Sequence, residues 1–352
     1  MEKEATINDV ARHAGVSKGT VDRVVHNRGE VSEKSAAKVR KAIEELNYRP
    51  NLHAALLATK NEKVIACMIP KGSRGTYWGD VQEGLLSQRE SAGTLSIRIE
   101  MFLYDMDDLS SFRQAGEKVL ESKVDGVIMS PLFMSEATTL CRRLHGKNLP
   151  YILIDTKIEE DDNYLAYIGM PKYKSGYLCA SILTLKCRKD ELRKVAIIRM
   201  KRDKAGLSDP TVSRREGFVD FMAEHYPDCE IINVMVNPSG SRMEINRTLG
   251  DALGNSGIRH IAVFSSRIHL ISEFLEGYPR KGGMVVGFDA LESNLSMLRN
   301  GTADTIIGEK IDTMSMEAVK IMTTFLVFYK KPEKRDNYMH MDILTALNLD
   351  NY

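Results

Sequence analysis

TINDVARHAGVSKGTVDRVV, residues 6–25, is the stretch that decides the fold of the N-terminal part of the chain. Thr6 is a good helix N-cap, and Asp9, three residues later, completes a variant of the capping box. Gly15 ends this first helix, and Ser17 is a suitable cap for a second one. The apolar residues of the first helix recur on one face: Ile7, Val10, Ala11 and Ala14. Two short helices joined by a tight turn with a glycine predict a helix-turn-helix.

A third helix follows Ser32, and its apolar residues stand at helical spacing: Ala36, Val39, Ile43 and Leu46. It ends before Pro50, which cannot continue a helix. We therefore predict a small all-α headpiece over residues 1–50. Residues 51–59 then form a helix of only about two turns, which is marginal on its own because nucleation is costly. We therefore expect this helix to need a partner, and we assign residues 51–62 to it and to a linker.

From residue 63 the pattern changes to short apolar runs that are bounded by Gly, Pro or Asp and read as buried parallel strands. Amphipathic helical stretches lie between them, at 81–92, 111–122, 213–225 and 310–328. The runs are KVIACMIP, DGVIMSP, PYILIDT, KVAIIRM, HIAVFSS and GMVVGFD. This alternation predicts an α/β doubly wound architecture. With about ten strands expected, residues 63–352 form two lobes of parallel sheet.

Composition narrows the function classes. The chain has 49 Lys and Arg against 48 Asp and Glu, so any nucleic-acid binding depends on a local patch. The five dispersed cysteines favour reduced structural thiols in the cytoplasm over a metal or redox role. The N-terminus lacks the apolar core of a signal peptide, and no apolar run approaches about 18 residues, the length that spans a membrane. Motifs of hydrolases, P-loop enzymes, dinucleotide enzymes and zinc proteases are absent from the sequence, so we predict neither an enzyme nor a cofactor.

The second helix of a helix-turn-helix enters the major groove with its N-terminal residues at the base edges. Lys18, Gly19 and Thr20 occupy that end, and Asp22 and Arg23 share the exposed side. A glycine there costs about 1 kcal/mol relative to alanine, but it lets the backbone approach DNA closely. Arg suits bidentate pairing with guanine, and hydroxyls at a helix N-terminus suit phosphate. The alternative is a solvated amphipathic helix in some other three-helix domain.

The segment 6–60 resembles the headpiece of the LacI/GalR family of bacterial transcription regulators. It matches T-I-x-D-V-A-x-x-A-G-V-S-x-x-T-V-x-R-V, followed by V-S, K-V, A-I-x-E-L-x-Y-x-P-N and A-x-x-L. The resemblance implies that Arg23 contacts a base and that Leu57 wedges into the minor groove from a hinge helix, which orders when two copies pair on the operator. Asp22 replaces the usual Ser, which puts a negative charge near phosphates. The predicted DNA-binding residues are Thr6, Ser17, Lys18, Gly19, Thr20, Asp22, Arg23, Asn27, Asn51, Ala54 and Leu57.

Residues 63–352 resemble the sugar-binding module of type I periplasmic binding proteins. Tyr77 and Trp78 fall where aromatic rings stack on a sugar in that family; a Tyr–Trp pair packed in the core between the lobes is the alternative. Asp155 and Asp289 close two apolar runs, at the strand ends where doubly wound folds bind ligands, although a lone acid is also a helix cap or a surface charge. The predicted effector-binding residues are Tyr77, Trp78, Asp155, Arg214, Ser265, Asp289 and Glu309.

Three of these positions carry further information through the resemblance. Arg214 matches the Arg of R-x-x-G-F, and Glu309 stands where a Gln is common. Ser265, with its neighbour Ser266, replaces a frequent Asn-Asp pair. Carboxylates, hydroxyls and one Arg form a polar set that orients a polyol. Because no cluster of cations is evident in the sequence, we expect a neutral or amino sugar, or another polyol, rather than a phosphorylated sugar.

The sequence therefore predicts a cytoplasmic transcription regulator, most simply a repressor, that binds palindromic operator DNA as a homodimer. A small sugar-like effector controls its DNA affinity by allostery, and in the DNA-bound state it is associated with the nucleoid. The alternative is a solute-binding protein or sensor in which DNA binding is secondary. The discriminating feature is the headpiece fused to a hinge, which that alternative does not need.

Overall fold

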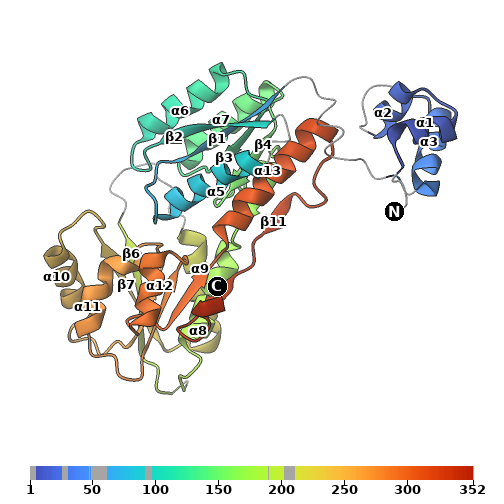
Figure 1. Ribbon diagram of the computed structural model, residues 1–352. Coiled ribbons are helices and arrows are strands. Elements are labelled where there is room, and N and C mark those ends of the chain that lie inside the picture. The colour runs from blue at the N-terminus through green and yellow to red at the C-terminus, as the bar shows by residue number, and fades with distance from the viewer. Residues whose placement is uncertain are drawn as a thin grey trace.

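The structure is a computed structural model that describes residues 5–25, 31–46, 48, 62–91, 97–188, 190–201 and 211–351. It consists of a helical headpiece and two α/β lobes (Figure 1). The predicted architecture is thus confirmed. Four predicted DNA-binding residues lie outside the described residues: Asn27, Asn51, Ala54 and Leu57.

The headpiece contains α1 (Ile7–Ala14), α2 (Lys18–Val25) and α3 (Glu33–Glu45). The capping box predicted at Thr6 and Asp9 is present, and Gly15 ends α1 in the left-handed conformation, with φ of 66°. Ser17 Oγ accepts a hydrogen bond from the backbone N–H of Thr20 at 3.1 Å, so it caps α2 as predicted. One apolar cluster joins the three helices, and its buried members are Val10, Ala11, Ala14, Val21, Val39 and Ala42.

Lobe 1 has an all-parallel sheet in which helices cover both faces. Its strands in spatial order are β11 (Asp336–Tyr338), β5 (Ala166–Gly169), β4 (Tyr151–Ile154), β3 (Gly126–Met129), β1 (Lys63–Pro70) and β2 (Ile97–Tyr104). Its helices are α5 (Tyr77–Ser91), α6 (Leu109–Glu121), α7 (Met134–Gly146) and α13 (Ile311–Phe328). The central strands are buried along their whole length, which explains their uniformly apolar sequences.

Lobe 2 repeats this plan, with β12 as an antiparallel edge strand. Its strands in spatial order are β12 (Asp342–Leu344), β10 (Thr305–Gly308), β9 (Met284–Phe288), β8 (His260–Val263), β6 (Lys194–Met200) and β7 (Glu230–Val236). Its helices are α8 (Lys172–Leu183), α9 (Val212–His225), α10 (Arg242–Leu253), η1 (Ile268–Ile271), α11 (Ser272–Gly277) and α12 (Glu292–Arg299), and η2 (Leu349–Asn351) follows β12. The two sheets together contain twelve strands in the described residues, two more than expected.

The chain passes between the lobes three times within the described residues. It crosses from β5 to α8, returns from β10 to α13, and crosses again from β11 to β12. We call the segments 170–171, 309–310 and 339–341 the crossovers. Helix α13 packs along α5 in lobe 1 (Figure 1), although it follows the last parallel strand of lobe 2.

The structure also bears on the predictions about cysteines and membrane-spanning segments. All five cysteines are free, and three of them are buried. None of the helices among the described residues is long and apolar enough to cross a membrane.

Candidate functional site: a recognition helix and an interlobe cleft

Helix α2 turns one side into the headpiece core and the other to solvent. Val21 is fully buried, whereas Lys18, Gly19 and Arg23 are exposed. The Ser17 and Thr20 hydroxyls lie 2.9 Å apart at the start of the helix. The exposed residues predicted to face DNA are therefore brought to one side and one end of α2.

Gly19 has no structural reason to be glycine. A Cβ atom added there would meet only Ser17 Oγ, at 3.8 Å, which is ordinary contact. The exposed glycine thus lowers the helix propensity without relieving a clash. This observation fits the interpretation that the backbone of α2 at Gly19 must approach another molecule.

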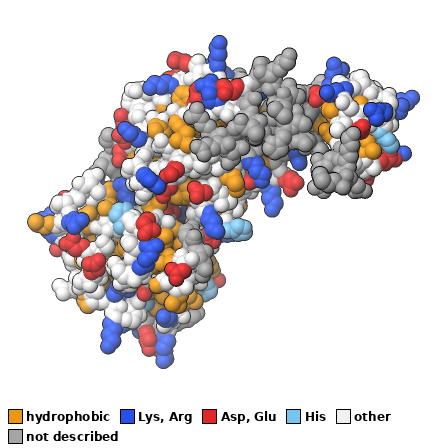
Figure 2. Space-filling model, in the orientation of Figure 1, with side chains coloured by type: hydrophobic (Ala, Val, Ile, Leu, Met, Phe, Trp, Pro, Cys, Tyr) orange, Lys and Arg blue, Asp and Glu red, His pale blue; other side chains and the backbone are white. Residues whose placement is uncertain are grey.

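Two of the other predicted DNA contacts have local roles in the headpiece. Thr6 Oγ1 donates to Asp9 Oδ2 at 2.6 Å as part of the capping box, so its hydroxyl is engaged in α1. Asp22 lies near Tyr48, whose pKa is raised by burial and by the Asp22 charge. In Figure 2 the headpiece carries Lys and Arg on its outer edge, while both signs of charge are interspersed over the lobes.

A cleft between the lobes contains the second candidate site. Its central chamber has a volume of about 120 Å³ and is walled by residues of both lobes. Six of the seven predicted effector-binding residues line it: Tyr77, Trp78, Asp155, Arg214, Ser265 and Asp289. Ser266, Lys172, Thr211, Leu132, Met200 and Phe264 complete the wall.

The two aspartates occupy equivalent places in the two lobes. Asp155 follows β4 and donates its backbone N–H to Ile168 of β5, while Asp289 follows β9 and donates to Ile307 of β10. Both have positive φ, 62° and 66°, a strained conformation that Asp adopts more readily than most residues. Each lobe thus has one aspartate in a sharp turn just after the C-terminal end of a strand. Doubly wound folds bind ligands at this edge of the sheet.

Lys172 lines the chamber but was not predicted as a site residue from the sequence. Its Nζ lies 2.7 Å from Asp155 Oδ1, and both groups are largely buried. Burial by itself would raise the pKa of Asp155, but the Lys172 charge and hydrogen bonds outweigh it, so the pKa lies below its usual value. Burial likewise opposes the charged form of Lys172, yet Asp155 and Glu309 raise its pKa. The signal was present, because Lys172 follows an apolar run, YLAYIGM, that ends at Pro171.

Arg214 reaches the chamber because α8 and α9 touch each other. A Cβ atom on Gly176 of α8 would lie 1.7 Å from the backbone oxygen of Arg214, so only glycine fits there. The guanidinium stacks on the Phe288 ring, 3.7 Å from its centroid, and Nε donates to Ser175 Oγ at 3.1 Å. Burial raises the pKa of Asp289, an effect that Arg214 and Lys172 offset only in part.

Tyr77 and Trp78 belong to the core of lobe 1 and also line the chamber. Their rings meet edge to face at 5.0 Å and belong to the apolar core of lobe 1, yet both line the chamber. The Tyr77 hydroxyl lies 3.1 Å from Asp155 Oδ1 and 2.8 Å from Glu309 Oε1. Burial, with the neighbouring Asp155 and Glu309, raises the pKa of Tyr77 well above its usual value.

Glu309 lies beside the central chamber and not in its wall. It is buried, with 3% of its surface exposed, and it is not among the residues that line the central chamber. It lies in the crossover after β10, where its carboxyl group is directed to the Tyr77 hydroxyl. Its hydrogen bond to the chamber wall is with Tyr77, and Glu309 also lines a separate outer compartment of about 630 Å³.

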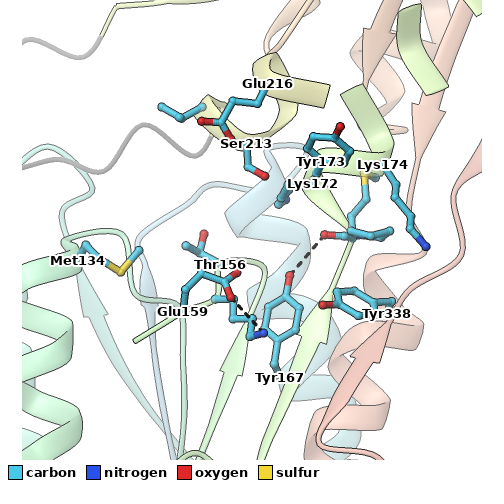
Figure 3. Close-up of a pocket in the computed structure, with 14 residues that line it drawn as sticks. Met134, Thr156, Glu159, Tyr167, Lys172, Tyr173, Lys174, Ser213, Glu216 and Tyr338 are labelled. Atoms are coloured by element: carbon cyan, nitrogen blue, oxygen red, sulfur yellow. Dashed lines mark hydrogen bonds and ion pairs between the residues drawn. The ribbon is translucent and has the colours of Figure 1, made fainter. Parts of the chain in front are cut away.

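Two larger compartments adjoin the chamber. The one beside the crossover 170–171, about 620 Å³ in volume, shares Lys172 with the chamber and is lined by apolar and aromatic residues together with charged ones, which are Lys157, Glu159, Lys172, Lys174 and Glu216 (Figure 3). Its apolar and aromatic lining residues include Met134, Tyr167, Met170, Pro171, Val212 and Tyr338. The opposite one, about 750 Å³ in volume, lies beyond β2 and β7, and its charged lining residues are Lys71, Asp107, Lys201 and Arg267.

The larger compartment of about 750 Å³ bears on the expectation that the ligand is not a phosphorylated sugar. The sequence showed no cluster of cations, but the fold brings three of them to one mouth of the cleft. The expectation against a phosphorylated sugar therefore rests on the central chamber alone, where Lys172 and Arg214 stand beside Asp155 and Asp289. No group of three or more His, Cys, Asp or Glu suited to a metal occurs among the described residues.

Comparison with known proteins assigns both parts of the chain. Residues 6–51 match the model for bacterial regulatory proteins of the lacI family, and residues 65–330 match the periplasmic binding protein domain. The HTH-type transcriptional regulator MalR of Streptococcus pneumoniae is 30% identical over 177 residues, 48% of this chain and 52% of MalR. The regulator RegA of Clostridium acetobutylicum is 32% identical over 183 residues, 52% of each chain. The chain thus spans about half the length of these curated relatives, which are regulators and not enzymes.

A solved structure extends the likeness over most of the chain. The crystal structure of a putative LacI transcriptional regulator from Bacteroides fragilis superimposes with a TM-score of 0.76 at 29% sequence identity. It covers 83% of this chain and 100% of the other.

Proposed function

The chain belongs to the LacI family of bacterial regulatory proteins, and from that membership we propose that it is a sequence-specific DNA-binding repressor controlled by a small sugar-like effector. One observation carries the proposal: a helix-turn-helix with an exposed polar face on α2 stands on the same chain as a cleft lined by paired carboxylates, Arg and aromatic rings. A protein that only binds a solute would not need the first of these two features.

On DNA, two copies of the chain place their α2 helices in successive major grooves of a palindromic operator. This arrangement follows from helix-turn-helix geometry, because half-sites one helical turn apart mirror the two-fold symmetry of a dimer. Arg23 reads a base edge, and Lys18, Gly19 and Thr20 set the distance of the backbone from the DNA. Leu57 wedges into the minor groove at the centre, as apolar side chains of minor-groove binders do. Operator binding places the protein in the cytoplasm, at the nucleoid.

In the cleft, the effector is a sugar or another polyol. Asp155 and Asp289 accept hydrogen bonds from hydroxyl groups, and Arg214 donates to them, while Tyr77 and Trp78 supply an apolar surface for a ring. The chamber residues come from both lobes, so a ligand that contacts all of them favours a closed cleft. Closure changes the relative position of the lobes and thereby shifts an equilibrium between two states of the dimer.

The proposal is tested first on DNA. The purified protein is used to select binding sites from random and genomic fragments at one fixed salt concentration, because protein–DNA affinity depends steeply on salt. We expect enrichment of a palindrome whose centre is a flexible pyrimidine–purine step. Absence of enrichment, both alone and with a metabolite extract, would contradict the proposal.

The effector is sought by following the fluorescence of Trp78, the only tryptophan of the chain, during titration with neutral sugars, amino sugars, polyols and sugar phosphates. We expect a neutral or amino sugar or a polyol to bind. Binding of a sugar phosphate at least about tenfold more tightly than the free sugar, ~1.4 kcal/mol, would show that the cations at the mouth of the cleft determine the ligand.

A further inference from the structure

The hydroxyl of Tyr77 lies between two carboxyl groups, and it has one proton for two contacts. Its oxygen is 3.1 Å from Asp155 Oδ1 and 2.8 Å from Glu309 Oε1. An ionised carboxylate only accepts hydrogen bonds, so one phenol proton satisfies one of them and leaves two oxygens in repulsive contact at the other. Both contacts are favourable only if one carboxyl group is itself protonated and donates to the phenol.

Their surroundings decide which of the two acids holds that proton. Asp155 receives hydrogen bonds from Lys172 Nζ at 2.7 Å and from the Thr156 hydroxyl at 2.9 Å, both of which stabilise its anion. Glu309 receives neither, and its second oxygen, Oε2, is buried without a hydrogen-bond partner among the described residues. A buried anionic oxygen without a donor is far more costly than a buried neutral carbonyl oxygen.

We propose that Glu309 is a positioning residue whose carboxyl group is protonated at neutral pH and donates to the Tyr77 hydroxyl, which in turn donates to Asp155. The chain of hydrogen bonds then runs from Glu309 through Tyr77 and Asp155 to Lys172. Glu309 lies in the crossover after β10, and Lys172 directly follows the crossover after β5. The protonated acid thus orients an aromatic residue of the chamber and ties together two of the segments about which the lobes move.

Burial is the largest influence on the pKa of Glu309, and its charged neighbours act in both directions. Burial raises its pKa, and Asp155 and Asp289 raise it further; Lys172 and the hydrogen bond with Tyr77 lower it but offset these effects only in part. The titratable groups that face this cluster from the surrounding elements are Tyr77 of α5, Asp155 after β4, Tyr167 of β5, Lys172 of α8, Arg214 of α9 and Asp289 after β9. Lys310 follows Glu309 in the chain, and Asp80, Glu83 and Asp312 border the same crossover from outside.

The raised pKa has a defined consequence for pH dependence. Between the ordinary glutamate value and the raised one, the folded chain holds a proton that the unfolded chain has lost. The stabilisation is complete below the ordinary value and is lost as the pH rises through the raised pKa. Asp289 contributes in the same direction, since its pKa is also raised. The contribution of Glu309 is therefore the difference in the pH dependence of stability between the native protein and a Glu309 variant.

The test uses Glu309→Gln in the full chain, with Glu276→Gln at an exposed position of lobe 2 as the matched control. A glutamine amide donates to Tyr77 as the protonated acid does, so the variant keeps the fold. Infrared difference spectra at neutral pH should show loss of a protonated carboxyl band in Glu309→Gln and loss of carboxylate bands only in the control. Loss of carboxylate bands alone in both variants would overturn the proposal.

A second readout uses Trp78, whose ring lies 5.0 Å from that of Tyr77. Without effector, its fluorescence should change as the pH rises through the Glu309 transition, and the change should be absent in Glu309→Gln. The same transition in native and variant protein would contradict the assignment. A third expectation rests on the proposed function. The affinity of the native protein for its effector should fall roughly three- to tenfold, the range of one hydrogen bond, when the pH rises above the Glu309 transition. In Glu309→Gln the effector affinity should not depend on this transition. Because the first two readouts need no effector, failure to find a sugar would count against the proposed function and not against the protonation of Glu309.

Discussion

The protonation of individual acidic residues in the cleft depends on burial and on the charges beside them. Asp155 is held as an anion by Lys172, whereas Asp289, in the equivalent place of lobe 2, has a raised pKa because burial outweighs the nearby cations. The two carboxyl groups thus present different acceptors to one ligand. In the headpiece the informative residue is Gly19, which has neither a positive φ nor a close neighbour.

Gly19→Ala separates folding from DNA binding. The substitution should increase the stability of α2 by up to about 1 kcal/mol, because alanine has the higher helix propensity and its Cβ meets no obstacle. It should reduce operator affinity by about tenfold, ~1.4 kcal/mol, since the methyl group moves the backbone away from the DNA. Hydrogen exchange across residues 16–25 and a binding titration measure the two effects. Unchanged operator affinity would show that α2 does not approach the DNA at Gly19.

Arg23→Ala tests base recognition. Loss of a bidentate contact with guanine should cost about 1–3 kcal/mol and relax one base position in each half-site. Arg40→Ala, on the exposed side of α3, removes the same charge and is the control. Binding to a set of operators with single base changes measures both variants. An equal loss of affinity for every operator would make Arg23 a phosphate contact.

At the scale of helices and strands, sequence periodicity predicted the element types well and some boundaries poorly. The capping residues Thr6, Ser17 and Ser32 correctly placed the starts of three helices. Helix α5, however, begins at Tyr77 rather than at residue 81. Its first turn contains Gly79, a poor helix former that is required because a Cβ atom there would lie 1.9 Å from the Ser73 oxygen. Tertiary packing, which periodicity does not contain, overrides local propensity at this point.

The candidate site could be predicted where a residue ends a recognised strand, as Asp155 and Asp289 do. Lys172 was missed because β5, a strand of four residues, was not recognised in the sequence. Glu309 was predicted from the family resemblance and not from a recognised strand, and its contact with Tyr77 joins residues 232 positions apart in the chain. Contacts of this kind are set by the packing of the lobes and not by local pattern.

Leu57→Ala tests the hinge segment, which lies outside the described residues. Removing an apolar wedge should weaken operator binding and reduce the DNA bend, because unstacking of the central step is no longer stabilised. Leu56→Ala removes the same atoms from the adjacent position and should have a much smaller effect. Gel mobility of bent fragments and effector titrations measure the outcome, and effector affinity should stay the same. An equal bend with Leu57→Ala and with the native protein would contradict the wedge assignment.

At the scale of the whole molecule, the crossovers join the two lobes that form the cleft. Three passages of the chain connect the lobes, and residues of both lobes form the chamber wall. Movement of one lobe against the other is therefore the coordinate that effector binding can shift, and linkage requires DNA and effector to influence each other equally.

Arg214→Lys should weaken effector binding without altering the headpiece. The lysine keeps the charge but loses the planar fork and the stacking on Phe288, so effector affinity should fall by about tenfold, ~1.4 kcal/mol. Operator affinity without effector should stay within about twofold, well below 1 kcal/mol. Arg242→Lys, exposed on α10, is the control. DNA titrations with and without the sugar identified by Trp78 fluorescence measure the coupling. A large change in operator affinity without effector would show that Arg214 acts on the conformational equilibrium itself.

The path of the chain also dictates the order in which the nascent protein is completed on the ribosome. Lobe 1 begins first but receives α13 and its edge strand β11 only when residues 311–338 have been synthesised. The five parallel strands of lobe 2 lie in one continuous stretch that ends at residue 308. The second lobe can therefore assemble its sheet while an apolar face of the first still awaits α13. Domains commonly fold in the order of their synthesis. Here the first lobe to emerge receives its covering helix α13 only after the five parallel strands of the second lobe are complete, and during that interval its uncovered face is the surface that a chaperone would meet.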